Sequence, residues 1–305
     1  PSTMLFRLAV GNPGACLRWC ARAVARLGDA LVARSVPAHV NRTAAEGVDL
    51  ARAAFDRGEG VLACGGDGTV QVLAEVAAEC GGLLGIIPMG SGNDFARSLG
   101  LDHRSPLGAL AVIDTGHETR VDLGRVRTAD GVVALFTTVA HSGLDGEVNR
   151  WANSVRRLSG TALYAVAAVR TIARYRPTEM RIVVDGEEWA GRLWMVSVAN
   201  SPCYGGGMRI APPARIDDGR LEVVFVHDVS RAQVLTRFPR MIRGTHLGID
   251  GVDHRSGTTV VVDGPGDQEI YASGERIGRL PATVEVLPAA LRVMVPVVAA
   301  TAPPP

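Results

Sequence analysis

Lysine is missing from this chain of 305 residues, and all 32 of its basic side chains are arginines. A P-loop needs a lysine beside the phosphates, a protein kinase needs one on a strand, and Schiff-base catalysis needs an amine. These three kinds of site are therefore excluded. Any phosphate that the chain binds must be met by backbone N–H groups, by arginine or by a metal ion.

Aromatic residues make up only 5% of the chain, and the formal net charge is +1. We therefore predict no nucleic-acid partner, because neither stacking platforms nor a basic surface is indicated. Five scattered cysteines without a Cys-x-x-Cys pair are typical of a reduced, cytoplasmic protein. No apolar stretch is long enough to span a bilayer, and no signal peptide is evident. Peripheral contact with the inner membrane face and a homodimer both remain open.

A glycine-rich turn at 65–69, Gly-Gly-Asp-Gly-Thr, follows a short apolar run at 60–63 and leads into an Ala-rich, helically spaced segment at 70–80. A strand-to-helix turn presents N–H groups and the positive end of the helix dipole, which suit a phosphate. Asp67 beside a phosphate needs a cation between them, so it predicts Mg²⁺. The alternative is a tight turn with an acid near the helix start.

A second glycine loop, at 90–95, follows the next predicted strand at 83–88. Further strands are predicted at 5–10 and 29–36, with helices at 16–27 and 43–57. This alternation predicts a doubly wound, mostly parallel α/β sheet. Ligands of such sheets bind at the carboxyl ends of the strands, so both glycine loops should open on the same edge.

The pattern changes after about residue 120, where short Val-rich runs alternate with Gly, Pro and Asp turns. Such runs predict a mainly antiparallel, β-sandwich-like second domain. An apolar content of 47% is sufficient for two ordinary domains with cores of their own. We therefore expect an α/β fold of two domains.

Further motifs follow the glycine loops in a fixed order: Val-Asp-Leu-Gly at 121–124, Asp-Asp-Gly at 217–219 and Ser-Gly-Glu at 273–275. In this order they resemble the diacylglycerol kinase catalytic family, in its branch of soluble bacterial lipid kinases, which is related to sphingosine and ceramide kinases. The first loop is shared with NAD kinases and phosphofructokinases, whereas the second loop and the Asp-Asp-Gly turn are more specific. The resemblance covers about residues 5 to 297.

The resemblance implies ATP- and Mg²⁺-dependent phosphorylation of a lipid hydroxyl. It implies a nucleotide-binding domain at 1–121 and 288–305, because the last strand of the family returns to the first domain, and a β-rich acceptor-binding domain at 122–287. Two alternatives stay open. The acceptor could be a hydroxyl other than that of diacylglycerol, such as a natural product, or the chain could bind nucleotide or lipid without turnover.

The resemblance also implies the nucleotide contacts. They are Asn12, Thr43, Gly65, Gly66, Asp67, Gly68, Thr69, Val70, Gln71, Ser91, Gly92 and Asn93. For Thr43 the alternative is a helix N-cap and nothing more. Asp94 would line the cleft near the metal or cap the helix that follows it.

A structural Mg²⁺ is implied at the Asp-Asp-Gly turn. Its ligands would be Asp218, with Asp217 beside it, and the backbone carbonyls of Arg215 and Arg220. Hard oxygen ligands on a tight turn suit Mg²⁺, and an acidic β-turn is the alternative.

The chain departs from the family at Ser273, where the family has the Asp of an Asp-Gly-Glu turn and uses an acid as the base. Serine cannot be that base unaided at neutral pH, so Glu275 becomes the candidate, with Asp67 and Ser273 as the other catalytic residues. Glu275 as a surface hairpin residue is the alternative. A literal Asp-Gly-Glu at 185–187 fits a hairpin turn, and we interpret it as structural.

Two arginine-rich stretches, at 150–157 and 170–176, remain outside these motifs. They are compatible with contact to anionic lipid headgroups and equally with a charged, solvated face.

Overall fold

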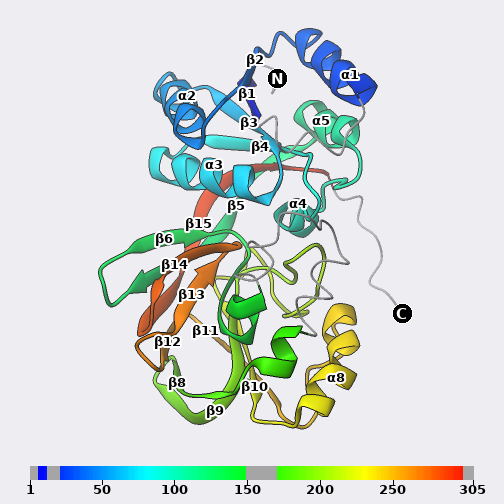
Figure 1. Ribbon diagram of the computed structural model, residues 1–305. Helices are drawn as coiled ribbons and strands as arrows, with labels where there is room; N and C mark the ends of the chain where they lie inside the picture. Colours follow the sequence, from blue (N-terminus) through cyan, green and yellow to red (C-terminus); the bar gives the residue numbers. More distant parts are fainter. Residues whose placement is uncertain (1–5, 12–20, 149–169, 298–305) are drawn as a thin grey trace. The chain divides into compact units, whose positions relative to one another are not determined.

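The computed structural model describes residues 6–11, 21–148 and 170–297 (Figure 1). The chain divides into two compact units, one formed by residues 1–121 and 290–305 and the other by residues 122–289. Strands β5 (His117–Thr128) and β15 (Ala282–Val295) each contribute residues to both units.

The first unit is built on a parallel sheet in the order β2-β1-β3-β4, and the end of β15 runs parallel to β4 at its edge. Its strands are β1 (Phe6–Gly11), β2 (Ala38–Val40), β3 (Gly60–Gly65) and β4 (Leu83–Pro88). Every residue of β3 and β4 is buried, as expected for continuous apolar runs in a parallel sheet. The predicted mostly parallel α/β fold is confirmed.

Within the described part of this unit, five helices accompany the sheet. They are α1 (Ala21–Val32), α2 (Ala44–Asp56), α3 (Asp67–Cys80), α4 (Asp94–Ser98) and α5 (Pro106–Thr115). Figure 1 shows α2 and α3 on one face of the sheet and α1 and α5 on the other. Local signals set their ends: Thr43 Oγ1 accepts the Glu46 N–H at the start of α2, and Gly81, at φ 64°, ends α3.

The predicted strand at 29–36 is wrong, because α1 continues to Val32 and β2 lies at Ala38–Val40. Gly28 and Asp29 imitate the end of a helix. However, Leu27 and Leu31 lie four residues apart and are both buried, so they continue one helical face.

The described strands of the second unit pair antiparallel. Its strands are the main parts of β5 and β15 with β6 (Val133–Phe136), β7 (Val139–Gly143), β8 (Thr178–Val184), β9 (Glu187–Ala199), β10 (Leu221–His227), β11 (Val252–Gly257), β12 (Thr259–Asp263), β13 (Glu269–Ala272) and β14 (Glu275–Arg279). They pair in the order β14-β13-β7-β9-β8-β12-β15, with β10 between β9 and β11. One helix of this unit, α8 (Arg231–Arg243), follows β10. The predicted antiparallel, sandwich-like domain is confirmed.

Strand β9 joins the parts of this unit, because its first half pairs with β8 and its second half with β7 and β10. Side chains of β10 alternate between two apolar cores: Val223 and Phe225 enter one, and Val224 and Val226 enter the other. This period of two buries both faces of the strand.

None of the helices in the described ranges is long and apolar enough to cross a membrane.

Gly124, on β5, lies directly under the buried ring of Phe136 on β6, and a Cβ at this glycine would be 1.9 Å from Phe136 Cζ. We expect Gly124→Ala to lower the free energy of unfolding by about 1–3 kcal/mol, because the ring must leave its packed position. Urea unfolding measures this. Gly266→Ala is the matched control, since a Cβ there meets nothing within 4 Å. Equal stability of the two variants would contradict this packing.

Candidate active site

The two glycine loops follow neighbouring parallel strands and touch each other. The first joins β3 to α3, and the second joins β4 to α4. A Cβ on Gly90 would lie 2.5 Å from the Cα of Gly66, so the backbones meet where no side chain fits. The loops therefore lie side by side at the carboxyl ends of β3 and β4.

Asp67 holds the two loops together with its carboxylate. Oδ2 accepts the Asn93 N–H at 2.8 Å, and Oδ1 accepts the Asp94 N–H at 2.7 Å. These are the first N–H groups of α4, which places Asp67 as the cap of a helix that begins 27 residues later. Each carboxylate oxygen keeps a second acceptor position, so contact with Mg²⁺ remains a prediction.

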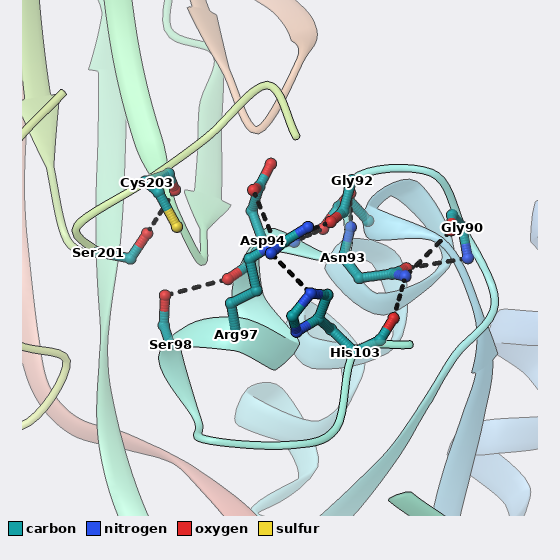
Figure 2. Close-up of polar contacts among 10 residues, drawn as sticks. Gly90, Gly92, Asn93, Asp94, Arg97, Ser98, His103, Ser201 and Cys203 are labelled. Carbon is teal, nitrogen blue, oxygen red and sulfur yellow. Dashed lines mark hydrogen bonds and ion pairs between the residues drawn. The ribbon is translucent and has the colours of Figure 1, made fainter. Parts of the chain in front are cut away.

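Asn93 gives the second loop its shape (Figure 2). Its backbone is left-handed, at φ 55°, and its side chain is buried. Its Oδ1 accepts from the Gly90 N–H, and its Nδ2 donates to the carbonyls of Gly90 and His103. These contacts give the Asn93 side chain a structural role in the loop. Its direct contact with a nucleotide remains a prediction.

Arg97 and His103 complete the network, and the sequence motifs gave neither of them a role. Arg97 Nε donates to the Gly92 carbonyl at 3.2 Å, and its Nη1 lies 2.7 Å from His103 Nε2 (Figure 2). Burial lowers the pKa of His103, and the charges of Arg97 and Arg104 lower it further. His103 is therefore a neutral acceptor for Arg97 near neutral pH. Asp94 is also buried, with Oδ1 3.8 Å from Arg97 Nε.

The remaining predicted nucleotide residues fall into two groups. Gly68 and Ser91 are exposed, and a Cβ at Gly68 would meet no protein atom within 4 Å. The others make contacts within the protein. Gly65 packs under the side chain of Thr69, Gly92 is buried against Asp67, and Thr43 caps α2. Val70 and Gln71 are buried, and the Gln71 amide donates to Glu75. Asn12 lies outside the described residues.

In the second unit, the Ser-Gly-Glu turn has nearly the same φ angles as the Asp-Gly-Glu turn. Ser273 and Gly274 have φ values of 46° and 88°, and Asp185 and Gly186 have values of 47° and 94°. Both are two-residue hairpin loops with positive φ at both positions. Aspartate tolerates this region better than serine does.

The side chains of the two turns differ in what they contact. The Asp185 carboxylate accepts the N–H groups of Thr258 and Thr259, which supports its structural interpretation. Ser273 Oγ lies 3.3 Å from Thr138 Oγ1. Glu275 is exposed at the start of β14, and its carboxylate makes no hydrogen bond or ion pair within the described ranges.

The Asp-Asp-Gly turn is anchored by Asp122 of the Val-Asp-Leu-Gly motif, which the sequence analysis left without a role. Asp122 Oδ2 accepts the Gly219 N–H and Oδ1 accepts the Ala289 N–H, both at 2.7 Å. Asp217 pairs with Arg215 at 3.2 Å. Asp218 Oδ1 accepts the Arg220 N–H at 3.0 Å.

Burial raises the pKa of Asp218, and the charges of Glu222 and Asp122 raise it further. A cation at this turn would relieve that charge. No cluster of three or more His, Cys, Asp or Glu side chains suited to a metal occurs in the part of the chain that the structure describes. A metal here would therefore need backbone carbonyls as well, as the resemblance implies.

Comparisons with known proteins agree with this architecture. Residues 8–126 match the family model of the diacylglycerol kinase catalytic domain, and residues 138–295 match that of the YegS C-terminal NAD kinase beta sandwich-like domain. The diacylglycerol kinase of Mycobacterium tuberculosis is 36% identical over 94% of each chain, and that of Bacillus subtilis is 26% identical over 72% of each. A crystal structure of a diacylglycerol kinase from Bacillus anthracis superposes with a TM-score of 0.75 at 20% identity, over 95% of this chain and 96% of the other.

The α/β unit with its paired glycine loops and the sandwich-like unit define a phosphotransferase of the lipid kinase class. The chain belongs to the diacylglycerol kinase family. Membership of a kinase family implies the use of ATP.

The hydrogen bond between Arg97 and His103 predicts a pH-dependent stability of the first unit. A histidine whose folded pKa is lowered contributes stability above its ordinary pKa of about 6.5, and this stability is lost as the pH falls. We expect His103→Gln to flatten the loss of stability between about pH 7 and pH 5, because glutamine accepts from Arg97 without titrating. Urea unfolding across that range checks this. The buried His246, whose pKa is also lowered by burial, is present in both proteins, so unchanged slopes would contradict the role of His103.

Proposed function

We propose that this chain transfers the γ-phosphate of ATP to a hydroxyl group of a lipid or lipid-like acceptor. The observation that carries the proposal is the pair of glycine loops held together by the Asp67 carboxylate. The Mycobacterium tuberculosis relative is named for diacylglycerol, so its hydroxyl is the acceptor that we propose first. Residues 1–121 with 288–305 would bind the nucleotide, and residues 122–287 would bind the acceptor.

The phosphates of ATP would be held by backbone N–H groups in the first turn of α3. Because the cap residue Gly66 is a glycine, it has no side chain to bond to these donors, and a Cβ at Gly68 would meet nothing within 4 Å. Because lysine is absent, Mg²⁺ would neutralise the remaining phosphate charge when bound, with Asp67 as its proposed ligand. Gly65, Thr69, Ser91 and Gly92 would complete the phosphate contacts.

Glu275 is the proposed base that removes the proton from the acceptor hydroxyl. Its carboxylate is exposed and makes no bond within the described ranges, so it is available to a substrate. Ser273 cannot take that role, and its hydroxyl lies beside that of Thr138. Phosphoryl transfer has a loose transition state, so positioning and charge neutralisation supply most of the catalysis.

Transfer from γ-labelled ATP to a panel of lipid and non-lipid hydroxyl acceptors tests the proposal. We expect Glu275→Gln to lower kcat by about 10²–10⁴, the usual contribution of a general base. Glu187→Gln is the matched control, since Glu187 follows the other hairpin turn of the same shape. Equal loss in both variants, or none in either, would contradict the assignment of the base.

Ser273 favours a second candidate, a protein that binds nucleotide without turnover. In that case ATP binds, no acceptor is labelled, and Ser273→Asp creates activity in a turn whose backbone already accepts aspartate. Transfer to another hydroxyl but not to diacylglycerol would assign the kinase a different acceptor.

We also propose that the Asp-Asp-Gly turn binds a structural Mg²⁺ through Asp218, with Asp217 beside it and the carbonyls of Arg215 and Arg220. The raised pKa of Asp218 means that its ionised form costs stability, and this cost grows as the pH rises through the folded value. We expect Mg²⁺ to raise the Tm of the natural chain and to have little effect on Asp218→Asn. Asp217→Asn is the control that keeps the response, because Asp217 already pairs with Arg215. An unchanged Mg²⁺ response in Asp218→Asn would contradict this site.

A further inference from the structure

Asn41 carries a buried amide oxygen that meets no donor within the described ranges. The residue follows β2 directly and is 5% exposed. Its Nδ2 donates to the carbonyl of Thr43 at 2.7 Å, whereas its Oδ1 is buried and accepts no hydrogen bond from the described residues. Buried acceptors are paired in the great majority of cases. An unpaired one therefore marks a position where a ligand can donate.

The contact with Thr43 fixes which way the amide of Asn41 faces. A carbonyl oxygen can only accept, so the amide directs its nitrogen toward Thr43 and its oxygen away from it. The reverse orientation would place two acceptor oxygens against each other. The unpaired atom is therefore an acceptor, and its partner on a ligand must be an N–H or O–H group.

The start of α2 is built around this amide. Gly47 is buried there, and a Cβ at this glycine would lie 3.1 Å from Asn41 Nδ2 and 3.2 Å from Val10 Cγ1. Glycine lowers the stability of a helix relative to alanine. The space that the amide and Val10 occupy explains why a glycine stands here, and the same packing holds Asn41 in one position.

The strand register places Asn41 on the edge of the sheet that carries the glycine loops. Val40 on β2 pairs with Gly11 on β1, and Gly11 pairs with Cys64 on β3. Asn41 and Gly65 therefore each come one residue after the same row of the parallel sheet. Two strand spacings separate them, which is roughly 10 Å. The amide thus lies on the same edge as the first glycine loop, two strands away.

This separation decides which part of ATP can meet Asn41. With the phosphates at the start of α3, as proposed above, the ribose and base extend away from the first glycine loop. Toward β4 the two loops meet too closely for a side chain, since a Cβ at Gly90 would lie 2.5 Å from Gly66 Cα. The nucleoside therefore lies toward β1 and β2, where a separation of roughly 10 Å from the phosphates matches the base.

We propose that Asn41 recognises the adenine base of ATP, with its Oδ1 accepting a hydrogen bond from the exocyclic amino group. Adenine carries a donor at this position, whereas guanine and hypoxanthine carry a carbonyl oxygen, which an acceptor repels. Asn41 is therefore a specificity-determining residue of the nucleotide site. This role rests on the proposed function, but nucleotide binding is measured without an acceptor, so the two can fail separately.

Calorimetric titration of the natural chain with ATP, purine riboside triphosphate and ITP tests the contact. Purine riboside triphosphate lacks the amino group, and ITP carries a carbonyl oxygen in its place. We expect the first analogue to bind about three- to ten-fold more weakly than ATP, the usual effect of one uncharged hydrogen bond, and ITP to bind more weakly still. Equal affinities for ATP and purine riboside triphosphate would overturn the assignment.

Asn41→Ala separates this contact from other effects of the amino group. We expect the variant to bind ATP about three- to ten-fold more weakly than the natural chain and to lose the preference for ATP over purine riboside triphosphate. His39→Ala is the matched control, because His39 is an exposed residue of β2 and should keep the preference. A preference that survives in Asn41→Ala would contradict a direct contact, even where the affinity falls for both nucleotides.

Titration with 2′-deoxy-ATP distinguishes the base from the ribose. We expect the natural chain and Asn41→Ala to lose affinity by the same factor for the missing hydroxyl, because Asn41 is assigned no contact with it. If that loss disappears in Asn41→Ala, the partner of Oδ1 is a ribose hydroxyl and the assignment to adenine is wrong. ATP that binds with the expected preference but labels no acceptor would contradict the kinase activity and still support the recognition of adenine.

Discussion

The first unit depends on one carboxylate that accepts two backbone N–H groups from a distant loop. Asp67 follows β3, and Asn93 and Asp94 follow β4, yet their hydrogen bonds make one surface of two loops. Hydrogen bonds to a charged group contribute about 1.5–3 kcal/mol each, which is large beside the total stability of a domain. The carboxylate thus fixes the backbone donors at the start of α3 relative to the second loop before any ligand is bound.

The second unit uses the same device at Asp122. Its carboxylate accepts N–H groups from Gly219 and Ala289, which are separated from it by 97 and 167 residues. Apolar contacts at these points would not fix the position of the turn, because they are not directional. The two hydrogen bonds do fix it. In both units, therefore, an acid within a glycine-containing motif organises backbone from elsewhere in the chain, and this role precedes any role toward metal or nucleotide.

The sequence predicted what local spacing determines and missed what long-range contacts determine. The alternation of apolar runs and glycine turns was sufficient to predict the fold type of each unit and the position of both glycine loops after their strands. The predicted end of the first helix was wrong because Gly28 and Asp29 resemble a helix stop. The burial of Leu31 against the core extends α1 beyond them. The bond between Arg97 and His103 carried no motif, and the bridge from Asp67 to the second loop has no spacing that a reader could recognise.

The two hairpin turns at 185 and 273 show that the backbone conformation needed for folding and the contacts of the side chain can vary independently. Their backbones are almost superimposable in φ, so folding requires only residues that tolerate the left-handed region. The contacts of the first side chain are independent of that requirement. Asp185 accepts two threonine N–H groups in one turn, and Ser273 lies beside a threonine hydroxyl in the other. Selection on reaction rate can therefore act at such a turn while the fold stays unchanged, and relatives with one architecture can differ widely in activity.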